Sequence, residues 1–214
     1  MIDISVLLRP GTPEWPGDTP WSCGWTAELS KGSTVNLSQI AGSPHVGTHA
    51  DAPLHVRDGA PGSDTLPLDA FIGRAMLIDL VPAAPSSVAR HPTLDDALDA
   101  YDPARDGERL LIRTGASIAG GVFPDAWPTI TPALARSLTA RGMRLFGVDA
   151  PSVDERDSRT LEVHHALFDG GACVLENLDL RHALAGPYEL IALPLRLHAL
   201  DAAPVRAVLR AQPT

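Results

Sequence analysis

The stretch Ser43-Pro-His-Val-Gly-Thr-His-Ala-Asp-Ala-Pro-Leu-His55 concentrates side chains that bind metals or transfer protons. Four of them recur at intervals of four, two and four residues: His45, His49, Asp51 and His55. Odd positions share one face of an extended backbone, and residues four apart stack on successive helical turns. Either conformation brings several of these side chains together.

The glycine and proline in this stretch indicate a particular backbone. Gly47 and Pro53 disfavour a regular element and predict a tight loop folded around a common centre. Neutral imidazole and carboxylate suit zinc and related divalent ions, whereas crowded imidazoles without a counter-charge repel one another on protonation. We therefore interpret the stretch as part of a metal site, and the isolated His91, His182 and His198 as ordinary surface or core residues.

The composition is that of an ordinary globular protein, with 214 residues, 44% hydrophobic and 20% charged. This length fits a single domain, residues 1–214. A net charge of -9 without a basic patch argues against nucleic acid and anionic membranes as partners. The chain has no apolar run long enough to cross a bilayer and no secretory signal, and Cys23 and Cys173 are expected to be free thiols, so we expect a cytoplasmic location.

Apolar periodicity predicts interleaved strands and helices. Strands are expected at residues 3–8, 21–29, 34–40, the end of 71–81, 109–114, 144–149, 173–175 and 188–193. Helices are expected at residues 94–101, 131–142 and 161–168, while 204–209 is ambiguous and 82–92 is a loop. This order predicts an α/β fold with a mixed sheet.

Two further features have open interpretations. Trp15, in a proline-rich loop, is either a lid over the core or a wall of a ligand pocket. A distant residue usually completes a metal site, and the candidates in the second half of the chain are His164, His165, Glu176, Asp149 and Asp154. Neighbouring helical residues point about 100° apart, so only one of the two histidines can face the site. Glu176 ends an apolar strand, where a ligand and a solvated loop carboxylate are both reasonable roles.

The segment 45–55 resembles the H-x-G-T/A-H-x-D-x-P-x-H signature of the cyclase-like metal hydrolases, whose best-known bacterial members are the kynurenine formamidases (arylformamidases). The resemblance covers nearly the whole chain and includes residues 13–20, 147–152, 164–165, 175–176, 188–195 and 200–209. It implies a single-domain fold of the swivelling β/β/α type with a mixed sheet, and a homodimer or higher homo-oligomer.

The same resemblance implies a role for each matching residue. His45, His49 and Asp51 would hold a first ion, and Asp51 would bridge to a second ion held by His164, with Glu176 contacting both. His55 would transfer protons, and Trp15 would line the substrate pocket. Two zinc ions per subunit are expected, although manganese or another divalent ion also suits these ligands.

The implied activity is metal-dependent hydrolysis of N-formyl-L-kynurenine to L-kynurenine and formate, by attack of metal-bound hydroxide on the formyl carbonyl. Asn177 stands where the family pattern has glycine, a departure that bears on the substrate. The alternatives are a related hydrolase for another amide such as isatin, and a metal-binding protein without catalysis. A serine hydrolase is excluded by the lack of a G-x-S-x-G elbow.

Overall fold

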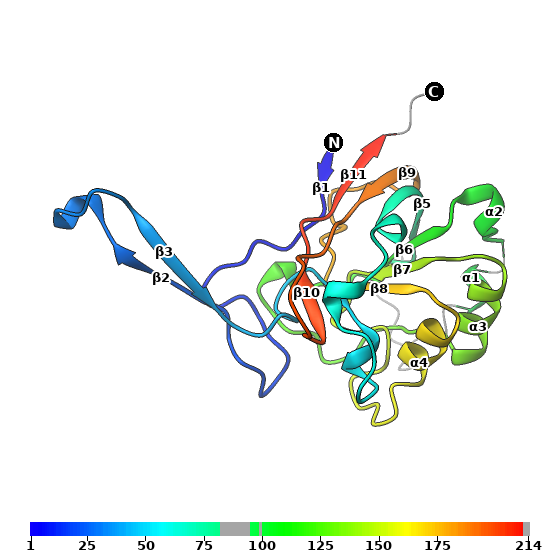
Figure 1. Ribbon diagram of the computed structural model, residues 1–214. Helices are drawn as coiled ribbons and strands as arrows, with labels where there is room; N and C mark the ends of the chain where they lie inside the picture. Colours follow the sequence, from blue (N-terminus) through cyan, green and yellow to red (C-terminus); the bar gives the residue numbers. More distant parts are fainter. Residues whose placement is uncertain (82–94, 99, 212–214) are drawn as a thin grey trace.

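A nine-stranded mixed sheet forms the body of the computed structural model, which describes residues 1–81, 95–98 and 100–211 (Figure 1). In sheet order the strands are β1 (Ile2–Asp3), β11 (Val208–Ala211), β9 (Gly186–Ile191), β5 (Ile72–Asp79), β6 (Arg109–Arg113), β7 (Leu145–Val148), β8 (Cys173–Glu176), β4 (His49–Asp51) and β10 (Ala202–Pro204). Strands β5 to β8 are parallel, and the pairs that flank them are antiparallel. The predicted α/β class with a mixed sheet is confirmed.

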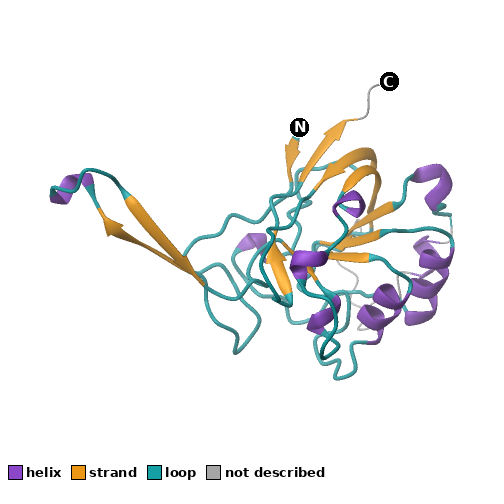
Figure 2. Cartoon of the chain, in the orientation of Figure 1, coloured by secondary structure: helices purple, strands orange, loops and turns teal. Residues whose placement is uncertain are grey.

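The sheet is buried on both faces because successive side chains of its central strands point to opposite sides. In β6, Leu110 and Ile112 join the apolar cluster on the helical side, while Leu111 joins the cluster on the other side. The helices are α1 (Asp95–Leu98), α2 (Pro103–Asp106), α3 (Pro132–Ala140) and α4 (Glu162–Asp169). Figure 2 shows them gathered on one side of the sheet. None of the described helices is long and apolar enough to span a membrane.

A two-stranded ribbon projects from this body (Figure 1). It consists of β2 (Ser22–Ala27) and β3 (Leu37–Ala41), which pair antiparallel around a short 3-10 turn at Leu29–Lys31. The predicted strands at 21–29 and 34–40 are therefore correct in kind and slightly too long.

Two other predictions need correction. The first strand ends at Asp3 rather than Leu8, because the Val6 amide donates to the Thr48 hydroxyl instead of to a neighbouring strand. The ambiguous segment 204–209 contains the end of one strand and the start of another. The predicted helix at 94–101 is only α1 among the described residues, and the predicted loop at 82–92 lies outside them.

Other predicted boundaries agree with the structure. The Thr131 hydroxyl accepts a hydrogen bond from the Leu134 amide, as an N-cap should, and α3 follows it. Helix α4 and strand β8 occupy the predicted segments 161–168 and 173–175 within one residue at each end. These last two elements matter most, because they approach β4.

Candidate functional site

Gly47 and Thr48 fix the conformation of the loop that carries His45 and leads into β4. Gly47 has a φ of +73°, and a Cβ at this position would lie 2.5 Å from the Leu8 side chain, so a larger residue would clash as well as strain the backbone. The Thr48 hydroxyl donates to the Asn177 carbonyl at 2.6 Å. The loop is thereby attached to the second half of the chain just before β4 begins.

Three side chains of this loop and of β4 converge as the sequence predicts. His45 Nδ1 lies 3.1 Å from His49 Nε2 and 3.1 Å from Asp51 Oδ1. His49 Nε2 lies 3.3 Å from the same carboxylate oxygen. His49 and Asp51 are buried, and His45 is partly exposed. These three atoms surround a small polar centre.

Two residues from the second half of the chain complete this centre. Strand β8 pairs with β4 so that Glu176 lies directly opposite His49, and Glu176 Oε2 is 3.5 Å from His49 Nε2. Helix α4 brings His164 Nε2 to 3.2 Å from Asp51 Oδ2 and 3.3 Å from Glu176 Oε1. Asp51 therefore contacts His45 and His49 through one oxygen and His164 through the other. Glu176 likewise contacts His49 through one oxygen and His164 through the other.

Each imidazole of the centre uses its second nitrogen for a hydrogen bond elsewhere. His49 Nδ1 bonds to the Gly47 carbonyl at 2.9 Å, and His164 Nδ1 bonds to Asp154 at 2.7 Å. His45 Nε2 bonds to Asp201 at 2.9 Å. Such partners set the ring tautomer, and they leave the other nitrogen's lone pair directed at the centre, as in histidine ligands of metals.

The electrostatic field of the centre favours positive charge. Burial alone lowers the pKa of His45, but the hydrogen bond to Asp201 and the negative charge of Asp51 outweigh it and raise that pKa to about 9. Burial also lowers the pKa of His49, but the negative charge of Asp51 outweighs it and raises that pKa to about 10. The pKa of His164 is raised well above its usual value, against burial, by its bonds to Asp154 and Asp51. A divalent cation bound at the centre would be stabilised by the same negative charges and would displace these protons.

One orphaned atom tests whether a metal fits. Asp51 Oδ1 is buried and has no hydrogen-bond partner, an arrangement that is costly for a carboxylate. Imidazole nitrogens of His45 and His49 lie 3.1 and 3.3 Å from it. A cation held by these three side chains would satisfy the orphaned oxygen, and the set of nitrogen and carboxylate donors suits zinc. The residues present therefore fit a metal ion.

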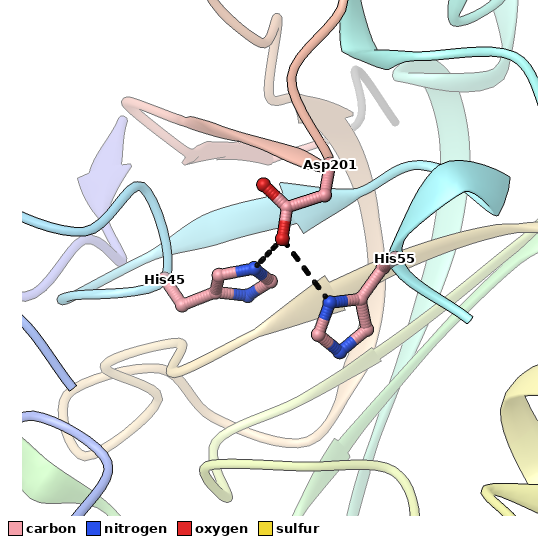
Figure 3. A group of neighbouring side chains, drawn as sticks. All are labelled: His45, His55 and Asp201. Carbon is pink, nitrogen blue, oxygen red and sulfur yellow. Dashed lines mark hydrogen bonds and ion pairs between the residues drawn. The ribbon is translucent and has the colours of Figure 1, made fainter. Parts of the chain in front are cut away.

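His55 lies beside this centre, on the 3-10 turn Pro53–His55. Its ring centroid is 4.4 Å from that of His45 and 5.6 Å from that of His164. His55 Nδ1 is 3.4 Å from Asp201 Oδ2, the oxygen that also bonds to His45 (Figure 3).

A cavity of about 320 Å³ opens onto the centre, and His45, His49, His55 and Glu176 lie in its wall. Trp15, the residue with two open interpretations, lines this cavity and packs edge-on against Phe123 at 5.5 Å between ring centroids. Trp15 also contacts Trp127 at 5.9 Å. One part of the cavity is thus charged and polar, and another is aromatic.

The remaining candidates from the second half lie elsewhere or act indirectly. His165 points away from the centre and approaches Arg57. Asp149 accepts hydrogen bonds from Thr114 and the Gly115 amide. Asp154 supports His164 and accepts from two amides in the first turn of α4.

Sequence reasoning missed Asp201 and Phe123. Asp201 follows an exposed leucine in a loop and belongs to no spacing pattern. Only the pairing of β10 with β4, in which Ala202 lies opposite Asp51, brings it to the histidines. Phe123 could have been suspected only from its proximity in sequence to Trp127.

Comparison with known proteins agrees with this arrangement. A family model described as "Putative cyclase" matches residues 2–155, more than half of the chain. "Kynurenine formamidase" from Salinibacter ruber (strain DSM 13855 / M31) is 44% identical over 215 residues, which is 100% of this chain and 98% of the relative.

Two solved structures share the fold over nearly the full length. A "potential metal-dependent hydrolase with cyclase activity" superposes with a TM-score of 0.78 at 29% identity, covering 99% of this chain and 98% of its own. A "predicted metal-dependent hydrolase" from Bacillus stearothermophilus superposes with a TM-score of 0.75 at 28% identity, covering 97% and 96%. These neighbours and the grouped histidines and carboxylates point to a metal ion. The chain belongs to the cyclase family.

Proposed function

We propose that this chain is a metal-dependent amide hydrolase that converts N-formyl-L-kynurenine to L-kynurenine and formate. The main support is the centre itself, in which ligands from both halves of the chain meet at the wall of a cavity that also carries aromatic side chains. The identity of 44% to a kynurenine formamidase over the whole chain supports the same substrate.

In this proposal two zinc ions would bind at the centre. His45, His49 and Asp51 would hold one ion, and His164 and Asp51 would hold the other, with Glu176 close to both groups. When bound, the ions polarise the formyl oxygen and allow water to act as a nucleophile at neutral pH.

The chain's own residues then orient the substrate and move a proton. Trp15 and Phe123 pack against the aryl ring, which places the formyl group toward the histidines. The C–N bond breaks only if the departing aryl nitrogen gains a proton. His55 takes a proton from the attacking water at Nε2 and passes it to that nitrogen, because its Nδ1 is engaged with Asp201.

A substrate panel tests this assignment directly. The zinc-loaded protein is incubated with N-formyl-L-kynurenine, formanilide and isatin, and formate, amine and isatinate are measured. Turnover of N-formyl-L-kynurenine with equal yields of formate and amine is expected. Hydrolysis of isatin alone would overturn the substrate, and full metal occupancy without any hydrolysis would favour a binding protein.

We also propose that the chain forms a homodimer in which the β2–β3 ribbon packs on a second copy. Cys23 lies opposite Ile40 and Trp25 opposite Ser38, so Cys23, Trp25 and Ile40 share one ribbon face. Trp25 is 61% exposed and Ile40 65% exposed. A lone two-stranded ribbon is barely stable in water, and the 20 residues from Ser22 to Ala41 match the roughly 20–30 residues that each side of a stable interface contributes.

The thiol of Cys23 reports on this contact. In the dimer Cys23 is expected to resist a thiol reagent and light scattering to give twice the chain mass. The double variant Trp25→Ser/Ile40→Ser is expected to be monomeric with a reactive Cys23, whereas Thr26→Ser, on the opposite ribbon face, is expected to remain dimeric. A monomeric wild-type protein with a freely reactive Cys23 would contradict the dimer.

A further inference from the structure

A single carboxylate oxygen of Asp201 contacts both His45 and His55. Its Oδ2 lies 2.9 Å from His45 Nε2 and 3.4 Å from His55 Nδ1. Figure 3 shows the carboxylate above both rings, with one contact to each. His164, by contrast, has its own carboxylate partner, Asp154.

The backbone holds this carboxylate in place from two sides. The Ala52 amide donates to the Asp201 carbonyl at 2.8 Å, next to the pairing of Ala202 with Asp51. The Ser63 amide donates to the Leu200 carbonyl at 2.8 Å. The residue that bonds to the histidines is therefore anchored directly to the strand that carries Asp51.

The direction of the two hydrogen bonds determines which ring atoms remain available. When His45 donates from Nε2, its Nδ1 keeps a lone pair toward His49 and Asp51. When His55 donates from Nδ1, its Nε2 is left to exchange a proton with a bound molecule. A carboxylate accepts both bonds at once, because it has lone pairs and no proton to donate.

We propose that Asp201 is a positioning residue that sets the tautomers of His45 and His55 together. This proposal rests on the proposed function for the role of His55. The Asp201 side chain is 42% exposed, so its contacts contribute little to global stability. Its effect is instead expected in the ring tautomers and in the turnover step that uses His55.

The test compares Asp201→Asn with Asp64→Asn in the zinc-loaded protein. Asp64 bonds to His198 and to the Ala199 amide in the same loop, so its variant perturbs a similar contact without touching His45 or His55. Nitrogen-15 NMR of the histidine rings is expected to show loss of the Nδ1–H form of His55 in Asp201→Asn only. A His55 ring that keeps its Nδ1–H form in Asp201→Asn, or the same change in Asp64→Asn, would overturn the proposal.

Kinetics supply a second, separable readout. Asp201→Asn is expected to lower kcat by about 10–100-fold with KM nearly unchanged. If Asp201 acts through His55, adding Asp201→Asn to His55→Ala lowers kcat little further, whereas a full additional loss would contradict the proposal. The tautomer measurement needs no substrate, so failure of the proposed hydrolysis would not be mistaken for failure of this assignment.

Discussion

Residues 43–55 supply their part of the centre from a loop and a three-residue strand, whereas residues 149–177 supply theirs from a helix and a buried strand. The first part brings His45, His49 and Asp51 together within seven residues, so local geometry is sufficient. The second part separates His164 from Glu176 by twelve residues and depends on how α4 and β8 pack beside β4. A compact motif is therefore visible from residue spacing alone, whereas the distributed residues are singled out in the sequence only by the family resemblance and are brought together by folding.

Removing the carboxylate shared by both parts should have the largest effect. Asp51→Asn is expected to lose most bound metal and to reduce kcat/KM by about 1000-fold or more, because a metal ion supplies several kcal/mol of charge stabilisation. Metal content by mass spectrometry and formate release measure the two losses. Near-normal occupancy of both ions would show that the two parts do not share this residue.

Removing the proton-transfer group should separate binding from turnover. His55→Ala is expected to retain its metal and lose about 100-fold or more in kcat, as for other general acid–base groups. His165→Ala, a histidine on α4 that points away from the centre, is the control. Full activity of His55→Ala would remove the assigned role.

A change confined to the second part tests whether that part is needed for metal binding. Glu176→Gln is expected to lower metal occupancy, because the side chain whose two oxygens face His49 and His164 loses its negative charge. Glu162→Gln, at an exposed position in the first turn of α4, should keep full occupancy. If the two variants bind equal amounts of metal, Glu176 is not a ligand and the first part is sufficient.

The pH dependence of the metal-free protein tests the field around the first part. His45 and His49 have pKa values raised from 6.5 to about 9 and about 10, so their bound protons stabilise the folded state. This contribution is complete below pH 6.5 and disappears as the pH rises through 9 and 10. Urea unfolding should show a loss of several kcal/mol between pH 6.5 and 10, since each unit of pKa shift corresponds to about 1.4 kcal/mol. Zinc-loaded protein should lose much less, since its ligands are already deprotonated.

The smallest effect is expected at the aromatic wall, which belongs to neither part. Trp15→Ala is expected to raise KM for an aryl formamide about tenfold with kcat changed less, while Trp15→Phe should largely restore binding. Initial-rate kinetics provide the measurement. An unaltered KM in Trp15→Ala would return Trp15 to a purely structural role against Phe123 and Trp127.

Local signals explain which elements could be predicted. The Thr131-Pro132 start of α3, the apolar strands β6 to β8 and the hairpin all carry capping, periodicity or turn signals within a few residues. Strands β4 and β10 are only three residues long, too short for periodicity to show. They are stabilised by pairing with distant segments, so no nearby residue predicts them.

The amino-acid sequence by itself determined the α/β class, the loop around His45, His49 and Asp51, and the set of chemical groups available to bind a cation, because each depends on residue type and short spacing. Spacing left the choice between His164 and His165 open; the folded chain has His164 at the centre, as the resemblance implies, Glu176 opposite His49, and Asp201 in contact with both His45 and His55. The physical reason is strand register and helix packing. Asp201 and Glu176 meet His45 and His49 only because strand pairing brings together groups more than a hundred residues apart in the chain.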